Sequence, residues 1–251
     1  MNIEFLPTVK TDTHTLINGD ALTEMAKLPT GSVDLVCVDL PYGVTQNKWD
    51  IPLPFEEMWT QFHRITKKKG AVVLTAAQPF AAMLIMSNLK YFKYEIIWEK
   101  TVASNQLNVR FQPLRVHENI LVFAKGSTTY NEQKTVGEPY SIKRNGKYRP
   151  GNYGAQKASE KQNTGFRHAR SVVKISNPRI KDGHPTQKPI ELMSYIINTF
   201  SNKGDVVIDC CMGSGSTGVA CAHLERFFIG IELSSEYFQS ACEGIQNVYN
   251  Q

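Results

Sequence analysis

Apolar runs bounded by turn residues alternate with amphipathic stretches along most of the chain. The run VDLVCV at residues 33–38 is uninterrupted, as is typical of a strand buried on both faces of a parallel sheet. Residues 190–200 place apolar side chains at helical spacing and predict a helix packed against such a sheet. This alternation predicts an α/β fold with helices on both faces of one sheet. The predicted strands cover residues 14–18, 33–38, 71–76, 94–98, 120–124, 206–211 and 227–233, and the predicted helices residues 21–27, 55–66, 80–89, 190–200, 217–224 and 236–248.

The alternation fades between Gly126 and Gly183, where only the stretch VVKI resembles a strand. This segment holds seven Lys and five Arg against three Glu and one Asp, a net charge of +8, so the rest of the chain carries −3 of the total +5. One basic segment on a slightly acidic body is typical of contact with nucleic acid. We predict a basic lobe, residues 126–183, inserted into an α/β domain formed by residues 1–125 and 184–251; a disordered surface loop is the alternative. The predicted phosphate contacts are Lys143, Arg144, Lys147, Arg149, Arg167 and Arg170, interleaved with Tyr140, Tyr148 and Tyr153.

The five cysteines form no CxxC pair and no Cys/His spacing typical of a metal site. Their odd number fits a reduced compartment better than a disulfide-bonded, secreted framework. The N-terminal stretch MNIEFLPTVKTDTHT lacks the apolar run of a signal peptide, and no stretch approaches the roughly 18 apolar residues that span a bilayer. We therefore expect a soluble, intracellular protein without a metal site and without a membrane partner.

A glycine loop, CMGSGSTG at residues 211–218, lies between a predicted buried strand and a predicted helix. Glycines allow close approach of the backbone to a ligand, and a helix N-terminus offers unpaired N–H groups to a carboxylate or phosphate. The next predicted strand ends near Glu232, whose carboxylate can accept both ribose hydroxyls of a nucleoside. The sequence therefore predicts a nucleoside cofactor site, with the candidate residues Asp209, Cys211, Gly213, Gly215, Ser216, Thr217 and Glu232.

The same glycines also spell GxGxxG, the fingerprint of dinucleotide-binding enzymes, so a nicotinamide oxidoreductase is a competing interpretation. A dinucleotide fold needs several strands after its acidic residue, yet the chain after Glu232 is long enough for only one helix. A circular permutation supplies the missing strands from the other end of the chain. Strand 14–18 and its terminal Asp20 would then lie beside Glu232 at the carboxyl edge of the sheet, with an adenosine between the two carboxylates.

The tetrapeptide Asp39-Leu40-Pro41-Tyr42 directly follows the VDLVCV strand. Here the chain resembles the amino-methyltransferases of DNA, whose tetrapeptide at this strand end is Asp/Asn/Ser-Pro-Pro-Tyr/Phe/Trp. The permuted order, with this loop first and the glycine loop last, resembles the β group of that family. Three further stretches are similar to family motifs: KKKGAVVLTA, His117-Glu118-Asn119-Ile120 and GHPTQKP at residues 183–189.

The resemblance covers nearly the whole chain and carries several implications. It implies a Rossmann-like, circularly permuted, seven-stranded methyltransferase sheet in which the basic insertion is a target-recognition region. The implied cofactor is S-adenosyl-L-methionine, with Lys188 and its neighbours at its methionine end. The implied reaction is methylation of adenine N6 in double-stranded DNA after base flipping, because Asp at the first tetrapeptide position is typical of N6 enzymes and Ser of cytosine N4 enzymes. A cytoplasmic protein of bacterial or phage origin, a homodimer and a companion restriction endonuclease are further expectations.

The tetrapeptide fits this chemistry. The exocyclic amine of adenine is a poor nucleophile because its lone pair is delocalised into the ring. If Asp39 and a main-chain carbonyl accept its two N–H hydrogens, the lone pair can point at the methyl group, and the carboxylate stabilises the developing positive charge. Tyr42 offers a flat face for an extruded base. Leu40 stands where proline is usual; it keeps the carbonyl but loosens the φ restraint of proline.

Three alternatives stay open at this point. A cytosine N4 or RNA methyltransferase would share the fold and the cofactor. A nicotinamide oxidoreductase would bind NAD instead. A non-catalytic nucleic-acid-binding module could keep the basic lobe, although the intact Asp39 loop beside an intact glycine loop disfavours it.

Overall fold

The computed structural model describes residues 8–43, 51–144, 158–177 and 187–249. The chain divides into two compact units, one formed by Met1–Asn131 and Ser171–Gln251 and the other by Glu132–Arg170. The predicted insertion, 126–183, extends beyond the smaller unit on both sides. On the C-terminal side β11 (Val172–Ile175) pairs with the sheet of the larger unit, and on the N-terminal side the Asn131 N–H donates to the Thr199 carbonyl at 2.8 Å.

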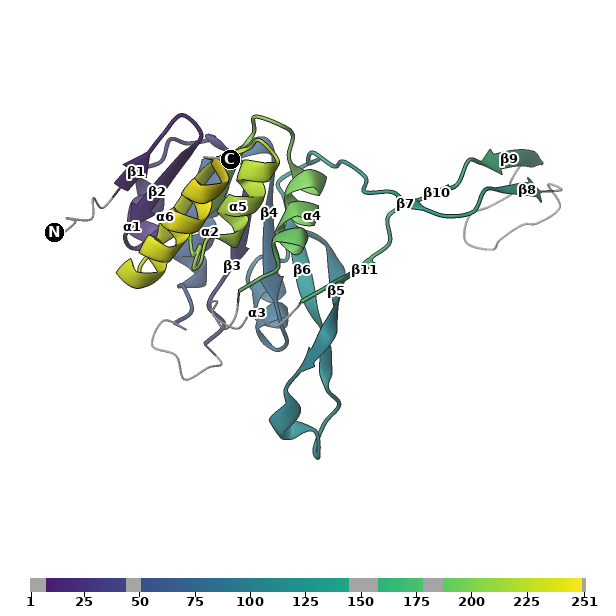
Figure 1. Cartoon of the computed structure of the whole chain (residues 1–251), viewed down its shortest axis with the longest axis horizontal. Helices are drawn as coiled ribbons and strands as arrows, with labels where there is room; N and C mark the ends of the chain where they lie inside the picture. The colour runs from purple at the N-terminus through teal and green to yellow at the C-terminus, as the bar shows by residue number, and fades with distance from the viewer. Residues whose placement is uncertain (1–7, 44–50, 145–157, 178–186, 250–251) are drawn as a thin grey trace. The chain divides into compact units, whose positions relative to one another are not determined.

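The larger unit is built on one sheet of nine strands among the described residues, in the order β1-β2-β13-β12-β3-β4-β6-β5-β11 (Figure 1). The seven predicted strands form its continuous centre, while β1 and β11 extend its two edges. The run from β2 to β4 is parallel, and β6 is antiparallel to both of its neighbours. This is a Rossmann-like sheet in which β6 is the antiparallel strand of the seven-stranded centre, and the edge strand β1 is antiparallel to β2. The strands are β1 (Thr8–Lys10), β2 (His14–Asn18), β3 (Val33–Asp39), β4 (Thr66–Ala76), β5 (Phe92–Ser104), β6 (Arg115–Phe123), β12 (Val206–Asp209) and β13 (Phe227–Glu232), besides β11.

Helices cover both faces of this sheet because the side chains of its central strands alternate between two apolar cores. In β3, Leu35 and Cys37 belong to one core, and Val36 and Val38 to the other. The first core contains residues of α4, α5 and α6, and the second contains residues of α1, α2 and α3. The helices are α1 (Ala21–Ala26), α2 (Phe55–Ile65), α3 (Phe80–Ser87), α4 (Ile190–Phe200), α5 (Ser216–His223) and α6 (Ser235–Tyr249), and a 3-10 turn, η1, covers Gln106–Asn108.

The two ends of the chain lie side by side in this sheet, as the predicted circular permutation requires. Strand β2 pairs in parallel with β13, and Asn18 lies opposite Glu232. The Gly19 N–H then donates to the Glu232 carbonyl at 3.0 Å. The purple N-terminal strands and the yellow C-terminal helix are accordingly neighbours (Figure 1). The permutation is confirmed, and it joins the strand ends that carry Asp20 and Glu232.

The smaller unit contains two short antiparallel ribbons within its described residues. Strand β7 (Thr135–Val136) pairs with β10 (Phe166–Arg167), and β8 (Tyr140–Arg144) with β9 (Ser159–Asn163). The sequence predicted none of these four strands. Their side chains are mostly polar and exposed, so no alternation of buried and exposed positions marked them.

No helix in the described parts of the chain is long and apolar enough to cross a membrane.

Candidate active site

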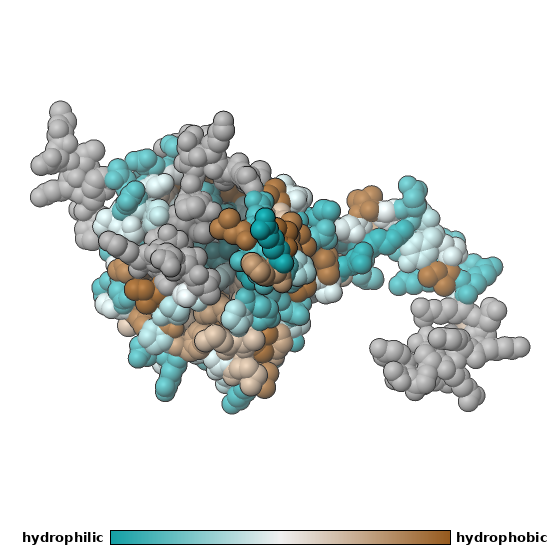
Figure 2. Space-filling model, turned by 90° about the horizontal axis from the view of Figure 1, so that it is seen from below, coloured by the Kyte–Doolittle hydropathy of each residue, from teal (hydrophilic) through white to brown (hydrophobic). Residues whose placement is uncertain are grey.

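The candidate residues converge on the carboxyl edge of the sheet, because parallel strands end at the same edge. Asp39 ends β3, Asp209 ends β12 and Glu232 ends β13. The β5–β6 hairpin also projects from this edge (Figure 1), and Figure 2 views the molecule from below, onto the same side. Residues 39, 209 and 232 are far apart in the sequence, and the sheet order alone brings them together.

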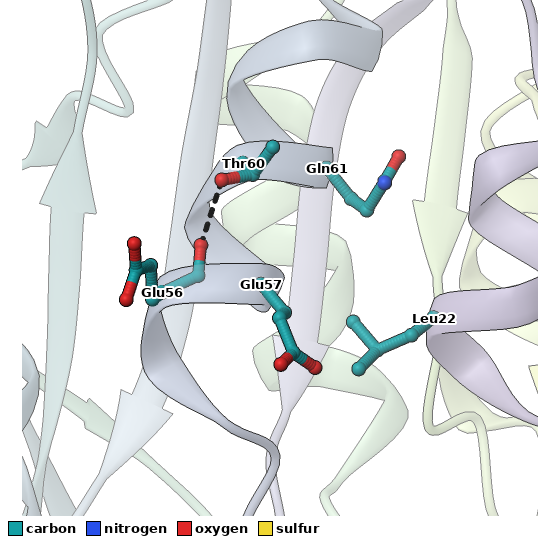
Figure 3. Close-up of a pocket in the computed structure, with 5 residues that line it drawn as sticks. All are labelled: Leu22, Glu56, Glu57, Thr60 and Gln61. Atoms are coloured by element: carbon teal, nitrogen blue, oxygen red, sulfur yellow. Dashed lines mark hydrogen bonds between the residues drawn. The ribbon is translucent and has the colours of Figure 1, made fainter.

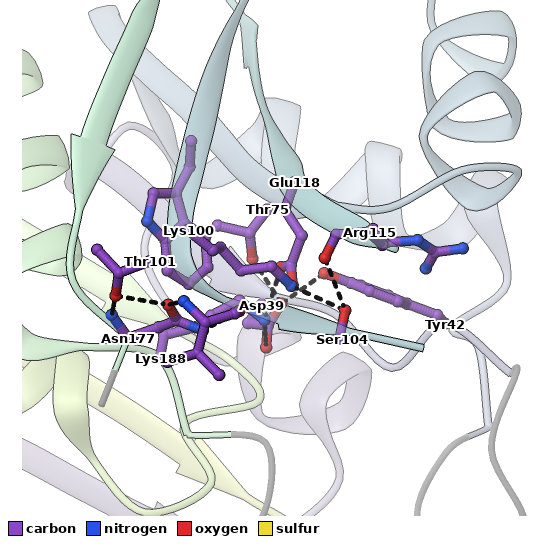
Figure 4. Close-up of polar contacts among 12 residues, drawn as sticks. Asp39, Tyr42, Thr75, Lys100, Thr101, Ser104, Arg115, Glu118, Asn177 and Lys188 are labelled. Atoms are coloured by element: carbon purple, nitrogen blue, oxygen red, sulfur yellow. Dashed lines mark hydrogen bonds and ion pairs between the residues drawn. The ribbon is translucent and has the colours of Figure 1, made fainter. Parts of the chain in front are cut away.

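The Asp39 carboxylate accepts three hydrogen bonds (Figure 4). Its Oδ1 accepts from the Tyr42 hydroxyl at 2.9 Å and from Thr75 Oγ1 at 2.5 Å. Its Oδ2 accepts from Lys188 Nζ at 2.7 Å. Thr75 is the register partner of Asp39 on β4, so sheet pairing places its hydroxyl here. Tyr42 and Thr75 occupy Oδ1, so a further donor has to approach Oδ2, where it competes with Lys188.

Lys188 joins two carboxylates. Besides Asp39, its Nζ lies 3.3 Å from Glu118 Oε2, and Glu118 Oε1 accepts from Lys100 Nζ at 2.8 Å. Oε2 is buried and accepts no hydrogen bond from the described residues, so its contact with Lys188 is an ion pair without hydrogen-bond geometry. The Lys188 side chain is only 10% exposed.

These ion pairs keep both Lys188 and Glu118 charged despite their burial. Burial by itself lowers the pKa of Lys188, but the negative charges of Asp39 and Glu118 raise this pKa well above its ordinary value. Burial by itself raises the pKa of Glu118, yet Lys188 and Lys100 bring it below its ordinary value. The site is therefore a preorganised set of alternating charges.

The rest of the tetrapeptide is anchored by packing. The Leu40 side chain is 4% exposed and belongs to the core that contains α1 to α3. Burial thus restrains the chain at the position where proline is usual. The Tyr42 ring stacks on Phe80 of α3, with ring centroids 5.0 Å apart, while its hydroxyl donates to Asp39. Pro41 is half-buried.

The glycine loop is tied to the end of β13. Gly213 donates its N–H to Glu232 Oε2 at 2.9 Å, and Ser234 donates to Oε1 at 2.8 Å. Gly213 and Gly215 have φ values of +52° and +83°, in the region that favours glycine. A Cβ on Gly213 would meet no atom within 4 Å, whereas one on Gly215 would lie 3.0 Å from Ala241 Cβ. The backbone at Gly213 therefore borders open space, and Gly215 packs against α6.

Asp209 connects the start and the end of this loop. Its Oδ2 accepts from Thr217 Oγ1 at 2.6 Å, and its Oδ1 accepts from the Cys211 N–H at 3.1 Å. Asp209 is buried, and burial raises its pKa to about 7, against the hydrogen bonds from Thr217 and Cys211, which lower it. Ser216, the first residue of α5, is also buried. Asp209 and Thr217 thus shape the loop from inside.

Asp20 lies at the same edge as Glu232, as expected, but its carboxylate caps α1. It accepts from the Thr23 N–H at 2.9 Å and from Thr23 Oγ1 at 2.7 Å, and these bonds lower its pKa. Asn18, which the sequence did not single out, donates from Nδ2 to the Glu232 carbonyl at 2.8 Å. An amide side chain from β2 therefore contacts the backbone at the end of β13.

The predicted phosphate contacts divide into three groups. Arg167 is engaged within its own unit, where it donates to Asn163 Oδ1 at 2.7 Å and to the Glu138 carbonyl, and lies over the Tyr140 ring. Lys143 forms an exposed ion pair with Glu160 at 3.4 Å, and Arg170 is exposed. The Arg144 side chain, Lys147 and Arg149 lie outside the described residues, as do Tyr148 and Tyr153.

Three residues around Asp39 were missed by the sequence analysis as site residues. Thr75 and Glu118 lie in stretches that it quoted only as motifs, KKKGAVVLTA and His117-Glu118-Asn119-Ile120. A polar residue at the end of a buried apolar strand was the available signal for Thr75. Lys100 gave no signal, because it lies beyond the strand predicted at residues 94–98 and a lysine there is ordinarily a solvated side chain.

A pocket of about 510 Å³ lies elsewhere, between α1 and α2 (Figure 3). It is lined by Leu22, Glu56, Glu57, Thr60 and Gln61, and none of these is a candidate site residue. Its lining shares no residue with the polar contacts around Asp39, although Leu22 follows Asp20 by two positions. Among the described residues, no group of three or more His, Cys, Asp or Glu side chains could bind a metal ion.

The arrangement matches a known family. The family model for DNA methylase, the N6/N4 methyltransferases, matches residues 33–243. The chain belongs to this DNA methylase family. The DNA adenine methyltransferase YhdJ of Escherichia coli (strain K12) is 31% identical to this DNA methylase, and the alignment covers 90% of this chain and 80% of YhdJ.

Solved structures agree on the fold. The M1.HpyAVI–SAM complex has a TM-score of 0.63 and 24% identity, covering 92% of this chain and 98% of that one. The cytosine-N4-specific PvuII DNA methyltransferase has a TM-score of 0.66 and 16% identity, and the alignment covers 96% of this chain and 93% of that one. These likenesses support the Rossmann-like methyltransferase sheet. Family membership also decides against the nicotinamide oxidoreductase as the interpretation of the glycine loop.

Proposed function

We propose that this DNA methylase transfers a methyl group from S-adenosyl-L-methionine to adenine N6 in double-stranded DNA. The observation that carries the proposal is the Asp39 carboxylate, positioned by Thr75, Tyr42 and Lys188 at the strand end beside the glycine loop. An aspartate in this position accepts a hydrogen bond from an exocyclic amine and stabilises positive charge on its nitrogen.

The residues at the ends of β12, β13 and β2 fit S-adenosyl-L-methionine, the ligand named for the M1.HpyAVI complex. Backbone at Gly213 borders open space, and Glu232 presents a buried carboxylate next to it. When bound, the cofactor supplies an electrophilic methyl group on a sulfonium. We assign the ribose hydroxyls to Glu232, the adenine side to Asp20, and the loop contacts to Gly213, Gly215 and Cys211, with Asp209, Ser216 and Thr217 maintaining the loop.

Lys188 has to leave room for the amine, and Glu118 provides its alternative partner. The amine of the extruded base donates one hydrogen to Asp39 Oδ2 and the other to the Leu40 carbonyl. Lys188 then moves toward Glu118 Oε2, which is 3.3 Å away and accepts no hydrogen bond among the described residues. The bound cofactor would supply the methyl group to the amine nitrogen and leave as the neutral thioether, and Asp39 would take the proton that the amine loses.

The proposal that DNA is the substrate is supported by the positive charge of the smaller unit. The smaller unit, residues 132–170, holds nine Lys and Arg against three Glu. Such an excess attracts the phosphate backbone without determining which bases are recognised. A homodimer, a companion endonuclease and a cytoplasmic location stay predictions.

Two measurements test the function. DNA from cells that express the chain is digested to nucleosides for mass analysis, and the same DNA is sequenced by a methylation-sensitive method. N6-methyladenine in one sequence context is expected. Detection of N4-methylcytosine instead would show that the target base is cytosine. Unmodified DNA together with inactive purified protein would overturn the proposal.

A further inference from the structure

The β5–β6 hairpin carries apolar side chains that contribute nothing to the core of the larger unit. In its tip, residues 105–114, Leu107 is 96% exposed and Phe111 is 87% exposed, and Val109 is 57% exposed. The tip projects from the carboxyl edge of the sheet (Figure 1), and the view from below shows apolar residues gathered near the middle of that face (Figure 2). Exposed aromatic and aliphatic side chains on one projecting turn indicate an interaction site.

The backbone of the hairpin tip is ordered by its own hydrogen bonds. Asn105, at φ +68°, precedes η1, and its Oδ1 accepts from Asn108 Nδ2 at 2.7 Å. The N–H groups of Phe111 and Gln112 donate to the Asn108 carbonyl at 2.9 and 3.1 Å. The apolar side chains are therefore displayed on a structured turn, and binding them would require little ordering of the backbone.

The base of the hairpin connects to the candidate active site. Lys100, which pairs with Glu118, also donates to Ser104 Oγ at 3.3 Å, and Ser104 Oγ donates to the Arg115 carbonyl at 3.3 Å (Figure 4). Ser104 follows Lys100 by four positions along β5, which places the start of the tip about 13 Å beyond Lys100. A duplex whose target base enters the Asp39 site would meet this tip.

The charge of the hairpin favours DNA as the occupant. Residues 101–117 contain Arg110 and Arg115 and no Asp or Glu. Phosphates on either side of an inserted side chain would pair with these guanidinium groups. In a symmetric contact between two copies of the chain, each tip would face the other and bring the positive charges of Arg110 and Arg115 together. This repulsion disfavours a second copy of the chain as the binding partner of the tip.

We propose that the hairpin tip is a wedge that inserts Leu107 and Phe111 into the DNA stack beside the target nucleotide. Apolar wedges unstack neighbouring base pairs, and a side chain that fills the vacated space stabilises the extruded base. This role rests on the proposed methylation of double-stranded DNA. It differs from the phosphate contacts proposed for the smaller unit and from the flat face that Tyr42 offers to the extruded base, because it acts on the duplex that the base leaves.

The double variant Leu107→Ser/Phe111→Ser tests the wedge on two duplexes of the mapped recognition sequence. One duplex is fully paired, and the other has a mismatch at the target base, which makes extrusion easy. We expect the variant to lose about tenfold or more in kcat/KM on the paired duplex and about twofold on the mismatched one. The matched control is Met86→Ser/Leu89→Ser, which removes two exposed apolar side chains at the end of α3 and should behave as wild type on both duplexes.

Three other outcomes of this experiment would each point to a different conclusion. Equal activity of variant and wild type on the paired duplex would overturn the wedge and leave the proposed function intact. Equal losses on both duplexes, together with a change from dimer to monomer in analytical ultracentrifugation, would overturn it in favour of self-association. A wild-type protein that methylates neither duplex would contradict the proposed function itself.

Discussion

Lys188 Nζ lies 2.7 Å from Asp39 Oδ2, although 149 residues separate the two in the chain. This pair places a buried cation on the carboxylate that is proposed to accept the substrate amine. A cation at that position competes with the amine, and Glu118 on the other side of Lys188 offers a second negative charge. The preference of Lys188 for Asp39 or for Glu118 should therefore control how readily Asp39 accepts a hydrogen bond from the substrate amine.

Glu118→Gln should slow methyl transfer without abolishing it. With a neutral amide at position 118, Lys188 has Asp39 as its strongest partner, and the amine must displace it. We expect kcat to fall about tenfold to a hundredfold, the range of a misplaced catalytic group, while the affinity for S-adenosyl-L-methionine changes little. Steady-state kinetics and calorimetry measure the two quantities. Glu99→Gln, which removes an exposed carboxylate paired with Lys174 on the same sheet edge, is the control and should be neutral.

Asp39→Ala should remove methyl transfer and leave cofactor binding largely intact. The variant lacks the carboxylate that accepts the amine hydrogen, and losing such electrostatic stabilisation costs about a hundredfold or more in kcat. Radiolabelled methyl transfer and calorimetric titration with the cofactor provide the measurements. Wild-type turnover in this variant would remove Asp39 from the mechanism. Asp12→Ala, at an exposed position near β2, serves as the control.

Glu232→Gln should weaken cofactor binding. The glutamine amide can accept from only one of the two backbone N–H groups of Gly213 and Ser234, and it presents no charge to ribose hydroxyls. We expect Kd for S-adenosyl-L-methionine to rise about tenfold, since a hydrogen bond to a charged group contributes about 1.5–3 kcal/mol. Calorimetry gives the Kd. Glu236→Gln, in the exposed first turn of α6, should leave it unchanged, and an unaltered Kd for Glu232→Gln would contradict the assigned pocket.

Asp209 should make the folded state less stable as the pH rises toward neutrality. Its pKa in the folded protein is about 7, against 3.8 as the ordinary value, so the folded state binds the proton more tightly than the unfolded one. This contribution to stability is fully present below about pH 4 and is lost as the pH rises through about 7. Asp209→Asn mimics the protonated form and removes the dependence.

The expected difference is measurable by urea unfolding between pH 4 and pH 8. The free energy of unfolding of Asp209→Asn, relative to wild type, should increase by a few kcal/mol across this interval, on the order of 1.4 kcal/mol per unit of pKa shift. Other titrating groups contribute equally to both proteins and cancel in the difference. A constant difference over the whole interval would show that Asp209 keeps an ordinary pKa.

Much of the larger unit could be predicted from local patterns. The apolar run at residues 33–38 became β3 because a strand buried on both faces has no room for polar side chains. The spacing at residues 190–200 predicted α4 with the observed bounds. By contrast, β5 and β6 extend beyond their predicted ranges, 94–98 and 120–124, because they pair with each other past the edge of the core. Pairing between exposed parts of two strands does not produce an alternation of apolar and polar residues in either sequence.

The sequence by itself determined the central strands and the helices of the larger unit, the order in which they occur, and the motifs at the strand ends that carry Asp39 and Glu232. Periodicity and turn residues act over a few neighbouring positions, so they can be interpreted without the fold. Only the tertiary structure decided that Thr75, Glu118 and Lys188 meet Asp39, and that Leu107 and Phe111 lie at an exposed tip. Those relationships depend on sheet order and packing between distant segments, and the free energy of burying one charge depends on which partners the whole fold supplies.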